Sequence, residues 1–169
     1  MPYKEDDPPA HNARTVIESL VDIVSKNGNL LMNVELYPDG SIPDPQRRIL
    51  EEVGAWLRIN GEAIYDTRPW KVYGEGPTRI DTGSFSDNQR RPFTGRDIRF
   101  TAKGEVLYAT LLAWPENDEA LIQSLGANLR LYPGEIGSVA LLGSGETLTW
   151  SRTARGLRVK LTADRKSVV

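Results

Sequence analysis

The chain has 169 residues, of which 39% are hydrophobic and 26% are charged, a composition typical of globular proteins rather than disordered ones. Its formal net charge of -2 and its pI of about 5.5 argue against nucleic acid or an anionic membrane as a partner. Because the chain has no cysteine, disulfides, thiolate metal sites and a cysteine nucleophile are excluded.

The first residues are charged and contain a Pro-Pro pair, so we expect a loop. They lack the apolar core of a signal peptide, and no apolar run approaches the roughly 20 residues of a membrane span. We therefore predict a soluble chain whose compartment is unknown. His11 is the only histidine, and we expect it to be a surface loop residue.

A helix followed by a short apolar run forms the first predicted unit. Asn12 is suited to cap a helix over residues 13–26, and Asn27-Gly28 supplies the left-handed residue that ends it. The run from Leu30 to Val34 is too short for a buried helix, so we expect a strand covered on both faces. Pro38-Asp39-Gly40 has the composition of a tight turn.

A second helix is predicted from its start and stop signals. Asp44 is a good N-cap, Pro45 suits the first helical position, and the pattern runs to about Ile59 before Asn60-Gly61 stops it. Trp56 lies on the apolar face of this helix, which indicates a core residue rather than a platform for a sugar.

Residues 62–77 are expected to form a connector anchored by Tyr65, Trp70 and Tyr73, with Trp70 at a domain junction rather than stacked on a sugar. Residues 79–96 are polar and rich in breakers, so we predict an exposed loop in which Arg90-Arg91 is solvated.

From Asp97 the hydrophobic period changes to two, and turn residues recur at short intervals. This pattern is typical of an antiparallel β-sandwich. We expect strands at 98–101, 106–114, 129–131, 139–142, 148–150 and 157–161, with 121–122 pairing at an edge.

Several pieces of the chain, taken in order, resemble the α-L-fucosidases of glycoside hydrolase family 29. They are residues 25–34, Pro38-Asp39-Gly40, and residues 60–65, 67–70 and 73–77, with a looser likeness from Asp97 to Pro115. The resemblance implies the end of a (β/α)8-like catalytic barrel followed by a C-terminal β-sandwich.

The expected fold class is therefore α+β, with a partial barrel and an antiparallel sandwich. Residues 1–78 would be a helix-strand-helix barrel remnant with its connector, 79–96 the exposed loop, and 97–169 the sandwich. A complete barrel needs roughly 200 residues or more, so the chain is expected to be a truncated fucosidase.

The resemblance also implies a retaining mechanism with an aspartate nucleophile, and no stretch of this chain resembles that motif. The family's acid/base is a glutamate near the segment matched by residues 4–7, which makes Glu5 the candidate acid/base, with Asp6 or Asp7 as replacements and a solvated acidic loop as the alternative. Glu35, beside the expected barrel mouth, is predicted to be a solvated loop acid. Substrate-binding residues are unknown, and no metal or cofactor is expected.

Two functions remain open at this point. The first is a truncated α-L-fucosidase, acting on terminal α-L-fucosyl residues of a glycan or fucoside, whose isolated chain is inactive or weakly active. The second is a non-catalytic β-sandwich module for carbohydrate binding or assembly. In either case, a lone strand at Leu30 to Val34 would leave backbone groups unpaired, which favours a homo-oligomer.

Overall fold

Helix α1 (Ala13–Ser25) forms where the sequence predicts it, and contacts at its two ends explain why. The structure is a computed structural model that describes residues 11–78 and 92–162. Asn12 accepts a hydrogen bond from the Thr15 backbone, and the Asn12 backbone donates to the Thr15 hydroxyl in return. Asn27 adopts the predicted left-handed conformation with φ 67°, and the Gly28 N–H donates to the Ile23 carbonyl.

Helix α2 (Asp44–Asn60) begins differently from the prediction. Pro43 occupies the N-cap position, so the assignment of Asp44 as the cap is wrong. Asp44 instead lies in the first turn, where its carboxylate accepts a hydrogen bond from Arg47 at 2.8 Å. The helix ends at Asn60, as predicted, and continues into the short 3-10 helix η1 (Gly61–Ala63).

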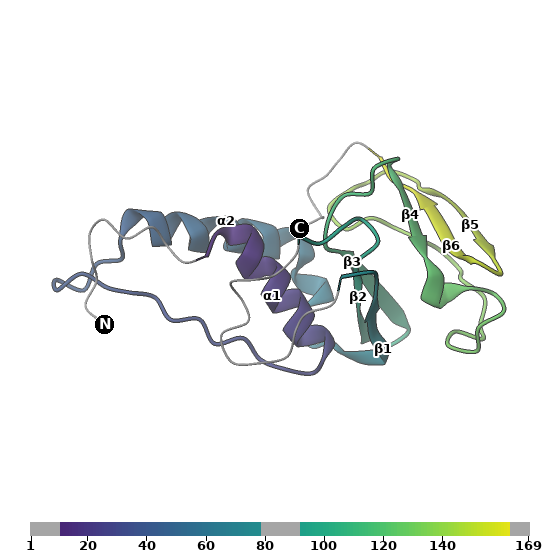
Figure 1. The fold of residues 1–169 in the computed structure, drawn as a ribbon, viewed down its shortest axis with the longest axis horizontal. Helices are drawn as coiled ribbons and strands as arrows, with labels where there is room; N and C mark the ends of the chain where they lie inside the picture. Colours follow the sequence, from purple (N-terminus) through teal and green to yellow (C-terminus); the bar gives the residue numbers. More distant parts are fainter. Residues whose placement is uncertain (1–10, 79–91, 163–169) are drawn as a thin grey trace.

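The strand predicted from Leu30 to Val34 is wrong. This stretch has no regular structure and runs as an extended segment from the end of α1 away from the sheets (Figure 1). A strand needs a neighbour to satisfy its backbone groups, and no other strand of the described residues pairs with this stretch. The turn at Pro38-Asp39-Gly40 is confirmed, with Gly40 at φ 85° and its N–H donating to the Tyr37 carbonyl.

The first sheet, sheet A, is antiparallel and has the order β1-β2-β3. Its strands are β1 (Arg68–Glu75), β2 (Ile98–Lys103) and β3 (Val106–Leu111). Strand β1 lies in the stretch predicted to be a connector. Its pairing with β2 shifts in register between Pro69 and Gly74, and this irregularity hides the strand pattern in the sequence.

The second sheet, sheet B, is also antiparallel and has the order β4-β6-β5. It consists of β4 (Glu119–Ile122), β5 (Thr149–Thr153) and β6 (Gly156–Lys160), with the 3-10 helix η3 (Gln123–Leu125) after β4. The edge position predicted for residues 121–122 is confirmed. The strands predicted at 129–131 and 139–142 are wrong, since both stretches are irregular.

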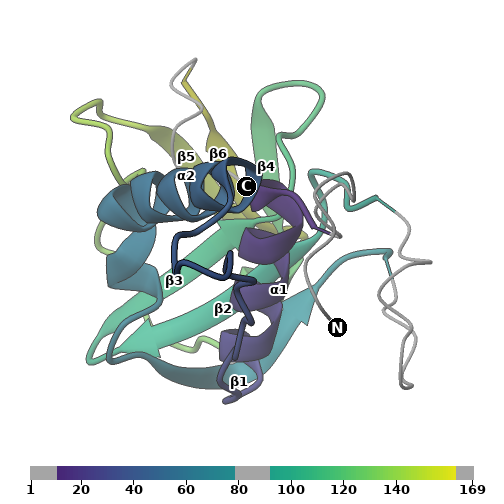
Figure 2. The same cartoon turned by 90° about the vertical axis from the view of Figure 1, so that its left-hand side faces the viewer.

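Two hydrophobic clusters hold these elements together. The larger cluster lies between the sheets and includes Phe100 of sheet A and Leu157 of sheet B. The smaller cluster lies between the helices and sheet A, and it includes Val21, Trp56 and Leu112. Helices α1 and α2 therefore cover one side of sheet A while sheet B packs on the other, as Figure 2 shows.

Neither helix of the described ranges is long and apolar enough to cross a membrane. The architecture is thus the α+β arrangement expected from the sequence, with antiparallel sheets in its second half.

Candidate functional site

The candidate catalytic residue lies outside the described residues. Glu5 and its alternatives, Asp6 and Asp7, precede residue 11, where the described part of the chain begins. Arg90-Arg91 and most of the predicted loop 79–96 also fall outside it. The role of Glu5 therefore stays a prediction.

The remaining predicted polar residues are exposed. His11 is exposed, as expected for a surface residue. Glu35 is also exposed, and it makes two hydrogen bonds with Gln46 of α2. The Glu35 N–H donates to the Gln46 side-chain oxygen at 2.8 Å, and the Gln46 amide donates to the Glu35 carboxylate at 3.3 Å. Glu35 thus attaches the extended segment to α2.

The aromatic residues divide into buried and exposed ones. Trp56 is confirmed as a core residue, at 7% exposure. Trp70 is half-buried and packs edge-on against Phe100, with ring centroids 5.1 Å apart. Tyr65 and Tyr73 are more exposed, at 58% and 51%, although the Tyr73 ring still lies against Lys26 and Arg99.

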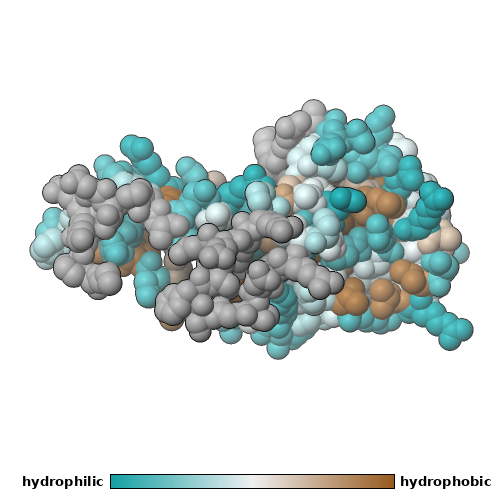
Figure 3. All heavy atoms as spheres, in the orientation of Figure 1, coloured by the Kyte–Doolittle hydropathy of each residue, from teal (hydrophilic) through white to brown (hydrophobic). Residues whose placement is uncertain are grey.

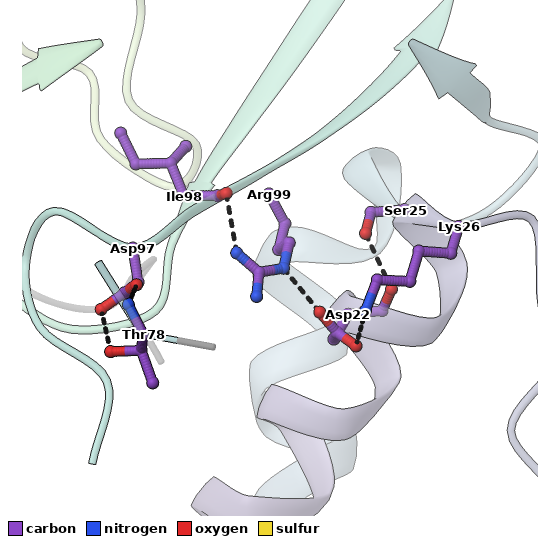
Figure 4. Close-up of polar contacts among 7 residues, drawn as sticks. All are labelled: Asp22, Ser25, Lys26, Thr78, Asp97, Ile98 and Arg99. Carbon is purple, nitrogen blue, oxygen red and sulfur yellow. Dashed lines mark hydrogen bonds and ion pairs between the residues drawn. The ribbon is translucent and has the colours of Figure 1, made fainter. Parts of the chain in front are cut away.

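A buried ion pair joins helix α1 to sheet A. The Arg99 Nε of β2 lies 2.6 Å from the Asp22 Oδ1 of α1, and the exposed fractions of the two side chains are 5% and 9%. Arg99 also donates to the Ile98 carbonyl at 3.1 Å. Figure 4 shows the guanidinium pointing from the strand towards the helix, where Asp22 meets it.

Further groups surround this pair. Lys26 Nζ lies 2.7 Å from the second oxygen of Asp22 and 4.8 Å from the ring centroid of Tyr73. The Arg99 guanidinium lies 5.5 Å from the Tyr73 ring and 5.6 Å from the Phe93 ring. Tyr73 is thus a partial cover over two cations, and these contacts lower the electrostatic cost of burying the arginine.

Asp97, immediately before β2, is a second polar centre and is fully buried. Its carboxylate accepts hydrogen bonds from the backbone N–H and the hydroxyl of both Thr78 and Thr94. Burial by itself would raise the pKa of Asp97, but the hydrogen bonds outweigh it and the pKa is lowered. Asp97 therefore fixes the two segments that lead into and out of residues 79–91.

A third contact joins the end of α2 to sheet A. The Tyr108 hydroxyl of β3 donates to the Glu62 carboxylate at 2.6 Å, and burial together with this hydrogen bond and charge raises the pKa of Tyr108 to about 12. The Thr101 hydroxyl donates to the Ala63 carbonyl at 2.7 Å. Both bonds hold η1 on the strands.

The chemistry of this region is that of a fixed junction. The described ranges contain no group of three or more His, Cys, Asp or Glu side chains that could hold a metal ion. The carboxylates of Asp22 and Asp97 are engaged by cations or N–H and O–H donors, so neither is an available nucleophile. What the arrangement does is hold α1 and η1 against the face of sheet A.

Sequence reasoning did not predict the Asp22–Arg99 pair. The only local signal is that Asp22 follows Val21, a residue of the apolar stripe of α1, and that Arg99 lies between two core residues of a strand. The partners are 77 residues apart in the chain, so no local sequence pattern indicates that they meet.

Comparison with known proteins gives two family matches, one in each half of the chain. A family described as "Alpha-L-fucosidase" matches residues 2–62, and one described as "Alpha-L-fucosidase C-terminal domain" matches residues 90–168. The plasma alpha-L-fucosidase of Rattus norvegicus is 35% identical over 150 residues, covering 86% of this chain and 28% of the relative. The tissue alpha-L-fucosidase of Bos taurus is 36% identical over 147 residues, covering 86% of this chain and 26% of the relative.

Solved structures are similar over nearly the whole chain. The Thermotoga maritima alpha-fucosidase superposes with a TM-score of 0.72 at 29% identity, covering 99% of this chain and 34% of the other. The alpha-L-fucosidase isoenzyme 1 from Paenibacillus thiaminolyticus has a TM-score of 0.67 at 26% identity, with coverage of 96% and 34%. The chain thus spans about a third or less of the length of these relatives.

Proposed function

Because this chain belongs to the α-L-fucosidase family, we propose that it acts as the C-terminal part of a retaining α-L-fucosidase. Such enzymes hydrolyse terminal α-L-fucosyl residues of glycans or fucosides. In this proposal residues 1–78 derive from the catalytic barrel, residues 79–96 are a loop, and residues 97–169 are the C-terminal sheet domain. The isolated chain has little or no turnover.

The observation that carries this proposal is that a buried ion pair joins the two family-matched segments. Asp22 comes from the first segment and Arg99 from the second, and the pair is almost fully removed from water. Breaking a buried ion pair by removing one partner typically costs about 3–5 kcal/mol. The sheets therefore support the helices that follow the proposed catalytic loop.

The proposed chemistry assigns one catalytic role to this chain. Retaining glycosidases use two carboxyl groups about 5–5.5 Å apart, one as nucleophile and one as acid/base. Glu5, or Asp6 or Asp7 in its place, would be the acid/base that protonates the departing glycosidic oxygen. The nucleophilic aspartate would come from outside these residues, and its absence is the reason for the low turnover expected of the isolated chain.

A chimera tests the proposed role directly. Residues 1–169 are substituted for the matched third of the Thermotoga maritima relative, and release of p-nitrophenol from p-nitrophenyl α-L-fucoside is measured. We expect the folded chimera to hydrolyse the fucoside and Glu5→Gln to reduce its kcat by at least about 100-fold. Glu52→Gln, at an exposed acid of α2, is the matched control and should leave kcat unchanged.

A folded chimera without activity would overturn the proposed role of the chain. If Glu5→Gln leaves kcat unchanged, Asp6→Asn and Asp7→Asn decide which acid takes the role. Robust turnover by the isolated chain, abolished by Glu5→Gln, would show that another acid in this chain serves as the nucleophile.

The second candidate is a non-catalytic module for carbohydrate binding or assembly. It is favoured by the single hydrophobic cluster that the two sheets share, which gives this half of the chain a core of its own. Titration of the isolated chain with L-fucose, followed by amide chemical shifts, separates the two. Saturable binding without turnover would support the module, and unchanged shifts would count against carbohydrate binding.

A further inference from the structure

Asp22 and Arg99 are charged residues that the fold removes from the surface. Hydrophilic colour prevails where the described residues are visible at the surface (Figure 3), which is the usual place for charges. Asp22 and Arg99 are instead 9% and 5% exposed, and their atoms Oδ1 and Nε lie 2.6 Å apart. Because burying two charges is costly and apolar residues are often at least as stabilising, stability alone does not explain the pair.

The pair differs from the apolar contacts of α1 in being directional. Ile17 and Val21 of α1 share a hydrophobic cluster with Trp56, and apolar burial has no preferred direction. The hydrogen bond that the Arg99 Nε donates to Asp22 weakens steeply when its length or angle departs from the ideal. The pair is therefore more sensitive than the apolar cluster to a small rotation of the helix.

Helix α1 transmits its orientation from Asp22 to its beginning. Asn12 caps the helix, and the hydrogen bonds that it exchanges with Thr15 set how the preceding chain enters it. At about 1.5 Å per residue, Asn12 lies about 15 Å from Asp22 along the helix, so a tilt of about 4° at Asp22 displaces Asn12 by about 1 Å. Glu5, the acid/base of the proposed enzyme, precedes Asn12 by seven residues in the sequence.

We propose that Asp22 and Arg99 are positioning residues for the acid/base, an inference that rests on the proposed fucosidase function. The pair sets the orientation of α1 on β2, and α1 sets the position of Asn12, to which the chain that carries Glu5 is attached. Neither Asp22 nor Arg99 exchanges a proton with the substrate. A misplacement of about 1 Å caused by a change far from the reacting atoms can reduce catalysis about 100-fold.

The expected defect lies in proton transfer to the leaving group. In a retaining glycosidase, the acid/base protonates the departing glycosidic oxygen. Phenolate is a much stronger base than p-nitrophenolate, so its departure depends more on that proton. Loss of the pair should therefore slow the cleavage of phenyl α-L-fucoside more than that of p-nitrophenyl α-L-fucoside.

Spin labels test the orientation of α1 in the chain itself. Because the chain has no cysteine, His11→Cys and Val106→Cys introduce two labelling sites at exposed positions, one before α1 and one at the start of β3. Pulsed dipolar spectroscopy measures the distance between the labels, and Asp22→Leu/Arg99→Met should shift its mean by at least about 1 Å. Leu157→Ala opens a cavity in the core between the sheets. It is the control for lost stability and should leave the distance unchanged.

The leaving-group dependence tests catalysis in the chimera described above. The value of kcat/KM reports the glycosylation step, in which the proton is donated. In Asp22→Leu/Arg99→Met, the ratio of kcat/KM for phenyl α-L-fucoside to that for p-nitrophenyl α-L-fucoside should fall at least about five-fold. Leu157→Ala should leave this ratio unchanged, because a loss of folded protein reduces the cleavage of both fucosides by the same factor.

An unchanged label distance in Asp22→Leu/Arg99→Met would overturn the inference, whatever the chimera does. An active chimera in which this double variant keeps the ratio of the two kcat/KM values would overturn the positioning role and leave the proposed function standing. A folded but inactive chimera of unchanged sequence would overturn the proposed function, and the positioning of its acid/base with it. If the double variant does not fold, Arg99→Lys takes its place in both measurements.

Discussion

Arg99 makes more polar contacts with other elements than its place in a strand suggests. Its guanidinium meets Asp22, the Ile98 carbonyl and the rings of Tyr73 and Phe93 in a region from which water is largely excluded. A buried pair is not by itself stabilising relative to apolar residues. It does fix the position of α1 on β2, because moving the helix would separate Asp22 from Arg99 and leave two buried charges without a partner.

Replacing Arg99 with methionine should destabilise the chain by about 3 kcal/mol, since Asp22 would remain buried with only Lys26 as a partner. The double variant Asp22→Leu/Arg99→Met should recover part of this loss. Urea unfolding measures both. Arg47→Met, which removes an exposed arginine paired with Asp44 and Glu51, is the control and should cost less than about 1 kcal/mol. A loss that small for Arg99→Met would contradict the role of the pair.

Asp97 should make stability depend on pH in the acid range. Its lowered pKa means that the folded state prefers the carboxylate. Its contribution is therefore complete above the ordinary carboxyl pKa of about 3.9 and is lost as the pH falls through the lowered value. Asp97→Asn should cost about 1.5–3 kcal/mol at pH 7, the range for hydrogen bonds to a charged group.

Urea unfolding of Asp97→Asn and the unchanged chain between pH 7 and pH 3 measures this dependence. The difference between the two should shrink as the acid range is entered. A difference that stays constant over the whole range would show that the charge of Asp97 does not contribute.

At the scale of elements, the sequence predicted what local contacts determine. The helices were found because Asn12 and Asn27-Gly28 act on their own neighbours. The strand at Leu30 to Val34 was wrong because a strand also requires a partner, which local sequence cannot supply. Strand β1 was missed because Pro69 and Gly74 interrupt its pattern, although pairing with β2 maintains it.

The candidate site was harder to predict for the same reason. The resemblance pointed to Glu5, outside the described residues, whereas the buried Asp22–Arg99 pair joins residues 77 apart in the chain. Charged residues inside apolar patterns were the only sign of it, and such residues are more often solvated.

Arg152 of β5 holds the irregular stretch between η3 and β5 in a fixed conformation. The sequence pattern had predicted strands in this stretch. The Arg152 guanidinium donates to the carbonyl of Leu125, at the end of η3, and to those of Tyr132 and Gly134 in the irregular part of the chain that follows. A planar group with several donors can hold three carbonyls at once, and a lysine ammonium cannot match this geometry.

Arg152→Lys should therefore cost about 1–2 kcal/mol and should accelerate amide hydrogen exchange in residues 127–148. Arg158→Lys is a suitable control, because Arg158 makes a largely exposed ion pair with Glu119 at 3.2 Å. Equal exchange in the two variants would show that the carbonyl contacts do not order this stretch.

At the scale of the whole molecule, strand β2 contacts the other sheet through apolar side chains and the helical side through polar ones. Ile98 and Phe100 lie in the core between the sheets, whereas Arg99 and Thr101 bond to the helical side. Leu112, fully buried just after β3, lies in the cluster with the helices. The helices cannot separate from sheet A without disrupting the strand that also organises the sheet pair.

We therefore expect the chain to unfold in one cooperative step, with helical circular dichroism and tryptophan fluorescence changing at the same urea concentration. Trp56 reports on the helix-side cluster, while Trp70 and Trp150 pack against the other. Leu112→Ala should lower the free energy of unfolding by about 2–5 kcal/mol, because it opens a cavity in the cluster that joins the helices to the sheet. The circular dichroism and fluorescence transitions should shift together to a lower urea concentration. If the helical signal is lost first while the sheets stay folded, residues 1–78 and 97–169 unfold independently. In that case β2 does not couple the two halves.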